Sequence, residues 1–403
     1  MSEIQKTERL TVVDALRGFS LAGIVIVHMV ENYAGGPLPE GAMSGAEQGL
    51  LDEVVNFFCL LFLRGKFFAL FSFLFGLSFY IQMDSGSRQN GQFGVRFAWR
   101  LLLLFIIGFV HHLFYRGDIL TVYALVGLFL IPFYRIRSGI VLGVAALLFL
   151  GVPRFLIYAL GHAPGLLMGG LMDPDNPLIS AYYETLRSGS IREVFRSNAW
   201  SGHLMKMEFQ LGVVSRAYLT FGFFLVGLWF GRTGYFRRFL ELAKQTRRAL
   251  WLSLSGLLVC TLLAGLIFTQ MGPNPDFNSG WAMIGLSILD LGNLAMTGII
   301  LCGFMLLYRM PASQKALNHL APFGRMALTN YFFQSVIGTF LFYGWGLGLL
   351  GEMRNSYAFL LALAIVYLQM RASRWWLQRF RYGPLEWAWR SLTHFRMFPI
   401  AVK

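Results

Sequence analysis

The segment AWRLLLLFIIGFVHHLFYRGDILTVYALVGLFLIPFY, residues 98–134, decides the fold. It holds two apolar stretches, 98–115 and 119–134, which are separated only by the tight turn Arg116-Gly117-Asp118. A helix needs roughly 20 apolar residues to cross about 30 Å of hydrocarbon, and both stretches approach that length. The segment therefore predicts two neighbouring transmembrane helices joined by a short turn.

The composition of the whole chain agrees with this local reading. Of 403 residues, 56% are hydrophobic and only 13% are charged, which is too apolar for a soluble globular protein of this size. The formal net charge of +14 would suit a nucleic-acid partner, but the basic residues are interleaved with long apolar runs. We therefore expect the lipid bilayer as the partner and no nucleic acid.

Eight further stretches of similar character predict an all-α polytopic membrane protein with ten transmembrane helices. The expected spans are residues 16–34, 67–83, 98–115, 119–134, 138–160, 211–231, 250–270, 281–308, 326–349 and 356–370. The apolar piece 54–63 is half the needed length, so we expect a re-entrant or interfacial segment leading into the second span. The loop of about 50 residues after the fifth span, 161–210, predicts an outer cap with an irregular start and a short helix at 186–195.

The basic residues indicate the orientation of these spans. Lys and Arg are retained on the cytoplasmic side of a membrane, and most of the 34 basic residues fall on one side when ten spans are assumed. This sorting predicts a multi-pass protein of the bacterial cytoplasmic (inner) membrane with both termini in the cytoplasm. A cleaved signal peptide is a weaker alternative for the first span, because residues 31–33 contain no small-x-small cleavage site.

The basic stretch 232–248 divides the chain into an N-terminal six-span half, residues 1–231, and a C-terminal four-span half, residues 232–403, with a basic tail. The tail from 371 mixes Trp with Arg, a composition that suits anchoring at the inner leaflet. One heptapeptide, FLFGLSF at 73–79, is echoed by FLVGLWF at 224–230. We interpret this echo as chance or as common helix packing through glycine, rather than as an inverted repeat.

Polar side chains within the spans are the candidate functional residues, because a titratable group at the bilayer centre costs a few kcal/mol. His28, Glu31 and Asn32 share one face of the first span. Asp290 in the eighth span needs a partner, for which Arg216 or one of the histidines is the natural expectation. The plain alternative for each of these groups is hydrogen bonding between helices.

Other polar residues are weaker candidates for a functional role. His111 adjoins the turn that contains Asp118, and Asn330 and Gln334 form an i, i+4 pair in the ninth span. Interfacial packing for the histidine and interhelical packing for the amides are the favoured alternatives. The three cysteines, Cys59, Cys260 and Cys302, lie in apolar stretches and offer neither a disulfide framework nor a zinc site. The chain contains no metal or nucleotide motif.

Several blocks resemble one bacterial family. These blocks are LTVVDALRGFSLAGI at 10–24, GKFFALFSFLFG at 65–76, GDIL at 117–120, GRMALTNY at 324–331 and GPLEWAWR at 383–390. In this order they are similar to the YeiB-like inner-membrane proteins, which carry domain of unknown function 418. The family has been described as probable transporters, so the resemblance implies a multi-pass membrane protein.

A more distant resemblance concerns chemistry. The start Asp-x-x-Arg-Gly, formed by Asp14, Arg17 and Gly18, with a polar residue eleven positions after the arginine, is similar to the first span of membrane acyltransferases that decorate surface glycans. In those enzymes the polar residue is a histidine proposed to act on the acyl group or the acceptor hydroxyl, and here it is His28. YeiB-like relatives commonly carry asparagine there.

This resemblance implies a possible acyltransferase. Acyl-CoA is then the expected co-substrate, with Arg17 and Arg325 near its phosphates, and an envelope glycan or lipid is the expected acceptor. His28 would be the catalytic base, oriented by Asp290 or Glu31. The remaining expected substrate-binding residues are Asn32, His111, Asp118, Asn330 and Gln334. The alternatives are a proton-coupled transporter that uses His28, Asp290 and Glu31 as relays, and a non-catalytic scaffold for envelope assembly.

Overall fold

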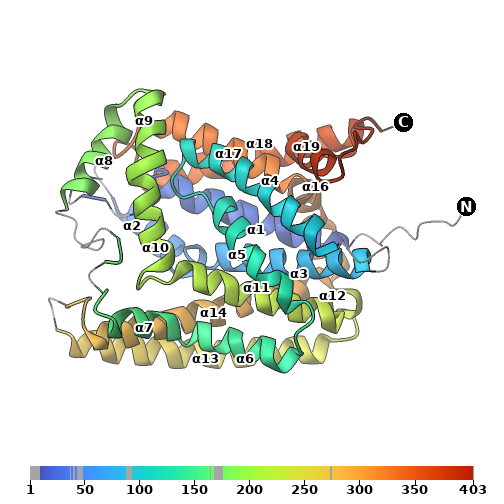
Figure 1. The fold of residues 1–403 in the computed structure, drawn as a ribbon, viewed down its shortest axis with the longest axis horizontal. Coiled ribbons are helices and arrows are strands. Elements are labelled where there is room, and N and C mark those ends of the chain that lie inside the picture. The colour runs from blue at the N-terminus through green and yellow to red at the C-terminus, as the bar shows by residue number, and fades with distance from the viewer. Residues whose placement is uncertain are drawn as a thin grey trace, which may run out of the picture.

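The computed structural model describes residues 10–36, 38–39, 41–42, 49–87, 93–163, 165–167, 176–272 and 275–402. Helices are the regular elements of these residues, apart from one isolated bridge between Phe380 and Ala401. The long helices run side by side, while α8, α9 and α10 lie at the end of the bundle away from α19 (Figure 1).

The elements follow one another in this order: α1 Thr11–Val30, α2 Leu50–Phe58, η1 Cys59–Leu63, α3 Phe67–Ser87, α4 Phe93–Phe114, α5 Leu120–Phe133, α6 Ser138–Phe149, α7 Val152–Ala159, α8 Pro177–Ser188, α9 Ile191–Ser197, η2 Asn198–Gly202, α10 His203–Leu211, α11 Arg216–Thr233, α12 Tyr235–Arg238, α13 Ala243–Gln270, α14 Gly280–Tyr308, α15 Pro311–Leu317, η3 Asn318–Leu320, α16 Ala321–Arg325, α17 Ala327–Phe342, α18 Asn355–Arg379 and α19 Pro384–Thr393.

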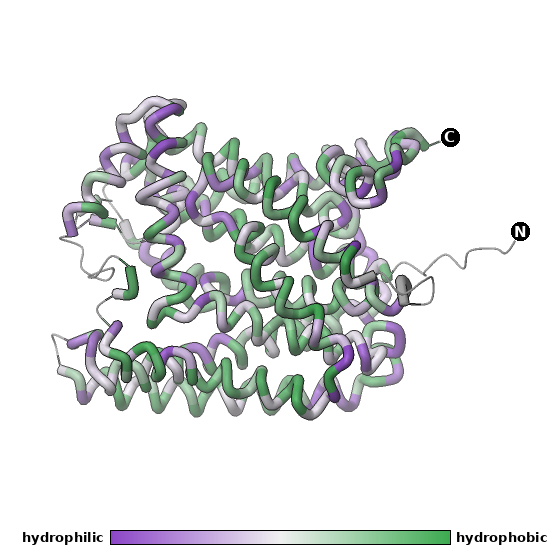
Figure 2. Tube along the Cα trace, in the orientation of Figure 1, coloured by the Kyte–Doolittle hydropathy of each residue, from purple (hydrophilic) through white to green (hydrophobic). Residues whose placement is uncertain are grey.

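Among the described residues, six helices are long and apolar enough to cross a membrane, and the number rises to eight if each of two bent helix pairs is one span. The bent pairs are α6 with α7, at 51°, and the run Ile191–Leu211 with α11, at 57°. Strongly hydrophilic residues gather mainly near the two ends of the long helices (Figure 2). The protein is therefore a multi-pass, all-helical membrane protein, as the composition predicts.

The count of ten spans remains a prediction. Nine expected spans overlap a single helix and the fifth, 138–160, is the bent pair of α6 and α7, while α5 has only 14 residues and α17 only 16. At about 1.5 Å per residue, such helices reach about 21 to 24 Å, which is less than the hydrocarbon thickness. The piece at 54–63 was expected to be re-entrant or interfacial, and it forms parts of α2 and η1, which continue into α3 as one 35-residue apolar run.

The two echoed heptapeptides pack directly against each other through their glycines, a contact that the sequence analysis did not predict. A Cβ added to Gly76 of α3 would lie 2.0 Å from the backbone oxygen of Phe224, and one added to Gly227 of α11 would lie 2.0 Å from that of Phe73. The rings of Phe75 and Phe224 stack with centroids 4.5 Å apart. The glycines thus allow two backbones to touch, and the phenylalanines fill the space beside them.

Helix α1 makes its most extensive contacts with α16 and α18, which come from the second half of the chain. The contact with α16 is backbone against backbone, because a Cβ on Gly324 would lie 2.0 Å from the backbone oxygen of Asp14. On another side, a Cβ on Gly23 would meet the ring of Phe67 at 2.3 Å. The first span is therefore enclosed by segments far from it in sequence.

The C-terminal tail lies on the surface of the bundle and also forms hydrogen bonds with other helices that stabilise it. The carboxylate of Glu386 in α19 accepts hydrogen bonds from the backbone N–H groups of Leu328 and Thr329, at 2.7 and 3.1 Å, and from the Thr329 hydroxyl at 2.5 Å. It thereby satisfies free donors at the start of α17. The indole of Trp389 donates to the backbone oxygen of Arg100 at 2.9 Å, and the Arg100 guanidinium stacks over that ring.

The segment 161–210 is more helical than expected. Residues 164 and 168–175, where the irregular start was expected, lie outside the described residues. Asn176 caps α8 at Leu178, and Ser190 and Glu193 form a capping box that begins α9. The expected helix at 186–195 is therefore interrupted at Gly189 and Ser190, and two helices stand in its place. The α10 helix that follows carries residues of the cavity described next.

Candidate functional site

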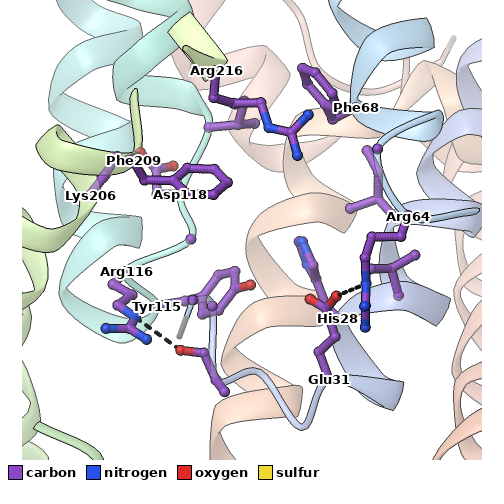
Figure 3. A pocket seen from close by; sticks show the side chains of 18 of the residues that line it. His28, Glu31, Arg64, Phe68, Tyr115, Arg116, Asp118, Lys206, Phe209 and Arg216 are labelled. Carbon is purple, nitrogen blue, oxygen red and sulfur yellow. Dashed lines mark hydrogen bonds and ion pairs between the residues drawn. The ribbon is translucent and has the colours of Figure 1, made fainter. Parts of the chain in front are cut away.

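A cavity of about 690 Å³ lies beside α10 and the start of α11. Five segments line most of it: the last turns of α1 and the residues after it, the turn between η1 and α3, the turn between α4 and α5, helix α10, and the start of α11. Its charged and histidine side chains are His28, Glu31, Arg64, Arg116, Asp118, Lys206 and Arg216 (Figure 3). The sequence-predicted residues His28, Glu31 and Asp118 are thus brought to one cavity.

His28 occupies the wall formed by α1. Its ring lies between two tyrosines, with centroids 5.4 Å from Tyr33 and 5.0 Å from Tyr115. The Nδ1 atom is buried and has no hydrogen-bond partner among the described residues. A buried polar atom without a partner is uncommon in a folded protein and commonly marks a functional site or a site for a ligand.

Glu31, one helical turn further along α1, is bound to a cation rather than to His28. Its Oε1 lies 2.7 Å from Nε of Arg64, in the turn that leads into α3. In Figure 3 the carboxylate of Glu31 points toward the same part of the cavity as the ring of His28. Gly65, which follows Arg64, has φ +81°, a conformation that allows the chain to turn sharply here.

Asp118 is the centre of a buried network. It accepts hydrogen bonds from the backbone N–H groups of Leu120 and Thr121, both at 3.0 Å, and so caps α5. Its other contacts are with Nδ1 of His111 at 2.9 Å and with Nζ of Lys206 at 3.0 Å. Burial alone would raise the pKa of Asp118, but the Lys206 ammonium and the hydrogen bond from His111 hold it well below its usual range. Asp118 is therefore a carboxylate, and His111 Nδ1 must be the donor.

Asp290 lies outside the cavity, and its partner differs from the expected one. The carboxylate is 2.5 Å from a terminal nitrogen of Arg154 in α7, rather than being paired with Arg216 or a histidine. Arg154 is 1% exposed and also donates to Ser287 at 2.7 Å and to the Val213 backbone oxygen at 2.6 Å. This arrangement is a structural ion pair that joins α7, α14 and the segment before α11.

The remaining expected residues are placed elsewhere. Arg17 binds Asp14 at 3.0 Å and Ser78 at 3.1 Å, near the opposite end of α1. The Arg325 guanidinium lies 3.5 Å from the backbone oxygen of Arg381.

The expected amides are buried in helix contacts. Asn32 accepts a hydrogen bond from the backbone of Gly351 at 3.4 Å, and the amide of Asn330 donates to Ser373 at 2.9 Å. Gln334 is wholly buried, and both polar atoms of its amide have no partner among the described residues.

Sequence reasoning did not assign several of the cavity residues to the candidate site. Lys206 and Phe209 lie in the segment that was expected to be an outer cap, and Arg64 and Arg216 border apolar spans like any flanking arginine. Tyr115 lies between the two histidines, with ring centroids 5.0 Å from His28 and 6.4 Å from His111. A lysine in a loop next to an apolar span was the only available signal for Lys206.

The arrangement can bind a polar ligand and move a proton at His28, while the apolar side chains of α1 and the Phe67-Phe68 pair can cover a hydrocarbon portion. No group of three or more His, Cys, Asp or Glu side chains within the described part of the chain could hold a metal ion.

The comparisons with known proteins agree with the family resemblance. Residues 230–396 match the family described as "Protein of unknown function (DUF418)". The chain is 29% identical to the "Uncharacterized 39.9 kDa protein in amylase 3'region" of Bacillus acidopullulyticus, covering 100% of this chain and 99% of that protein. It is 28% identical to the uncharacterized protein YxaH of Bacillus subtilis, with coverage of 100% and 99%, and 28% identical to the uncharacterized protein YeiB of Escherichia coli, with coverage of 96% of each chain. No solved structure matches the chain. The C-terminal part of the chain is thus similar to the DUF418 family, and nearly the whole chain is similar to YeiB.

Proposed function

We propose that this protein is a transmembrane acyltransferase of the bacterial inner membrane, with both termini in the cytoplasm. It moves an acyl group from cytoplasmic acyl-CoA to a hydroxyl or amine acceptor that binds in the cavity. The observation that carries the proposal is the ring of His28, which lines the cavity and has an unpartnered Nδ1 atom. A neutral imidazole in a partly desolvated cavity is suited to general-base catalysis.

The geometry of α1 supports a connection between the proposed binding site of the acyl donor and the cavity that binds the acceptor. Arg17 and His28 are eleven residues apart, so they lie on nearly the same face of α1, about 16 Å apart along its axis. Arg17 precedes Gly18 and Arg325 follows Gly324, the two glycines whose backbones meet where α1 crosses α16. Both arginines therefore flank one helix crossing at the end of α1 opposite the cavity, where the Arg17 guanidinium contacts Ser78 and that of Arg325 lies by the Arg381 backbone oxygen. They are the candidates for contacts with the phosphates of acyl-CoA.

The reaction follows from these positions. His28 takes the proton from the acceptor hydroxyl or amine as its oxygen or nitrogen attacks the thioester carbonyl carbon. The new acyl bond forms, the carbon–sulfur bond breaks, and the imidazolium returns its proton to the departing thiolate of CoA. The cation of Arg64 holds the carboxylate of Glu31 beside this site, so Glu31 can stabilise the imidazolium electrostatically. Asp290, bound to Arg154, has no part in this step.

Binding of the donor is the first test. Purified full-length protein in detergent would be titrated with acetyl-CoA and with a long-chain acyl-CoA by calorimetry, using wild type, Arg17→Ala, His28→Ala and His319→Ala. We expect binding that is lost with Arg17→Ala and retained with the other two variants. His319 is exposed in η3 and serves as the matched control. Absence of binding to either donor would refute the proposal.

Turnover is the second test. Inverted bacterial membrane vesicles containing the protein expose the cytoplasmic face to acetyl-CoA and keep the native acceptors. Release of CoA would be followed by chromatography, since the three free cysteines of the protein would react with thiol reagents. His28→Ala should lower the rate by roughly 10²- to 10⁴-fold, and His319→Ala should not. An unchanged rate with His28→Ala would contradict the assigned role.

Proton-coupled transport of a small solute is the second candidate, favoured by a specific observation. The cavity holds two ion pairs, Glu31 with Arg64 and Asp118 with Lys206, in which a proton or a solute could exchange for the bound cation. In that case solute would leave proteoliposomes unmodified, at a rate that follows the imposed pH gradient, and acyl-CoA would have no effect.

A further inference from the structure

The charges of the cavity do not cancel. Four cationic side chains line it, Arg64, Arg116, Lys206 and Arg216, against two carboxylates. Each carboxylate already has a cationic partner, since Glu31 lies 2.7 Å from Arg64 and Asp118 lies 3.0 Å from Lys206. The described lining therefore carries a positive excess within a largely apolar enclosure, where charge interactions are stronger than in water.

Arg216 is the clearest source of this excess. Its guanidinium stacks over Phe68 at 4.2 Å and lies 5.4 Å from the ring of Phe209. Within the described ranges it forms no ion pair and donates no hydrogen bond, and Figure 3 shows its head group between the two sides of the cavity. Two aromatic rings thus lie beside a guanidinium whose donors remain available to a ligand.

The acidic groups that act on Arg216 electrostatically are already committed. These groups are Asp290 and Glu31. Asp290 is bound to Arg154 at 2.5 Å, and Glu31 to Arg64. A desolvated cation without a counter-ion is costly, so the site favours a ligand that brings negative charge. A planar guanidinium binds carboxylate or phosphate oxygens through two parallel hydrogen bonds.

Two buried acceptors on the cavity wall specify a second property of the ligand. Gln210 and Asn355 are among the residues that line the cavity, and their Oε1 and Oδ1 atoms are buried and have no donor among the described residues. Each would be satisfied by a hydroxyl group of a bound molecule. Apolar residues, among them Ile24, Val27 and Leu63, form the remaining wall. The lining therefore combines an anion site, acceptors for hydroxyl groups and an apolar surface.

From this combination we infer that the cavity binds a phosphate ester that carries free hydroxyl groups, with its phosphate on Arg216. The inference that such an ester binds in the cavity does not depend on the proposed function. The further step, that this ester is the acyl acceptor whose hydroxyl groups face His28, rests on the proposed function. The same chemistry occurs in the headgroup of an anionic glycerophospholipid and in a soluble polyol phosphate.

The test measures binding without any acyl donor. Full-length protein in nanodiscs of phosphatidylcholine would be titrated with short-chain dihexanoyl phosphatidylglycerol, with glycerol 3-phosphate and with dihexanoyl phosphatidylcholine as the zwitterionic comparison. The variants are Arg216→Gln, Arg216→Lys and Arg192→Gln. Arg192 is an exposed arginine of α9 outside the cavity and is the matched control. Thermal unfolding of each variant shows that it is folded.

We expect at least one of the two anionic probes to bind, with its Kd raised about tenfold or more in Arg216→Gln, by a smaller factor in Arg216→Lys, and unchanged in Arg192→Gln. Binding of phosphatidylglycerol alone identifies a lipid headgroup, and binding of glycerol 3-phosphate identifies a soluble ester. If Arg216→Gln does not fold, the reduced affinity of Arg216→Lys, which keeps the charge but loses the fork of donors, carries the test.

The inference is overturned if neither anionic probe binds, if phosphatidylcholine binds as tightly as phosphatidylglycerol, or if the folded Arg216 variants bind as wild type does. Because no acyl-CoA is present, these results do not depend on catalysis. A protein that binds the anionic probe but transfers no acyl group would refute the proposed function and leave this inference intact. If the protein transfers an acyl group to another acceptor but binds neither anionic probe, the proposed function stands and this inference is refuted.

Discussion

Replacing Asp118 by asparagine should destabilise the protein more than any single hydrogen bond would suggest. The backbone N–H groups of Leu120 and Thr121 donate to different oxygens of Asp118, so the single oxygen of asparagine can keep only one of these two capping hydrogen bonds. The negative charge is lost, and the ammonium of Lys206, whose side chain is 6% exposed, remains buried without its counter-ion. Breaking a buried pair by removing one partner costs about 3 to 5 kcal/mol.

The expected shift in the unfolding midpoint follows from the size of the protein. With an unfolding entropy of about 2 cal/mol/K per residue and 403 residues, a loss of about 4 kcal/mol lowers the midpoint by roughly 5 °C. Unfolding can be followed in detergent with a thiol-reactive fluorophore, since Cys59 and Cys302 are buried in the folded protein. All variants would be heated at one scan rate, because unfolding of large membrane proteins is commonly irreversible.

A double variant separates charge from packing. Asp118→Asn combined with Lys206→Met removes both charges and keeps most of the lysine's apolar stem. We expect it to be about 2 kcal/mol more stable than Asp118→Asn alone, since the uncompensated charge is gone. Lys315→Met, at an exposed lysine of α15, is the control for lysine replacement. The reasoning is refuted if Asp118→Asn unfolds at the wild-type temperature, or if the second substitution brings no recovery.

Three further substitutions test the packing of the bundle with the same thermal assay. Glu386→Ala should cost about 1 to 3 kcal/mol because the backbone donors at the start of α17 lose their acceptor, and an unchanged midpoint would show that water replaces the carboxylate. Gly227→Leu should prevent correct packing of α11 on α3, whereas Gly143→Leu, at a glycine with open space around it, should be tolerated; equal yields of folded protein would contradict this. Asp290→Asn should cost about 3 kcal/mol by leaving Arg154 without its counter-ion, and it should not abolish acyl-CoA binding, whose loss would return Asp290 to the functional site.

Hydropathy predicts the helices well because it depends on local sequence. Nine of the ten expected spans overlap a single helix, and the fifth is the bent pair of α6 and α7. The spacing of polar residues on α1 also places His28 and Glu31 at one cavity. What these successes share is that the information lies within one helix or one bent pair of helices.

The predictions that failed concern contacts between residues that are distant in sequence. The partner of Asp290 is Arg154, 136 positions earlier, and no periodicity relates the two. Lys206 reaches Asp118 because α10 folds back over the turn between α4 and α5, which its own sequence does not indicate. The prediction of the site was therefore limited by the packing of the segment 161–210, which composition marks only as a polar loop.

The pairing of α1 with α16 has a consequence for the synthesis of the protein. The glycines that meet at this crossing, Gly18 and Gly324, are separated by about 300 residues of chain. At a translation rate of roughly 5 to 20 residues per second, the first helix waits about 15 to 60 seconds in the bilayer before its partner is made. The contact of Glu386 with the start of α17, the helix after α16, forms later still. During that interval the small-residue face of the nascent first helix is open to lipid, to insertion factors and to membrane proteases, so the abundance of this protein in the cell should depend strongly on how fast the chain between α1 and α16 is translated.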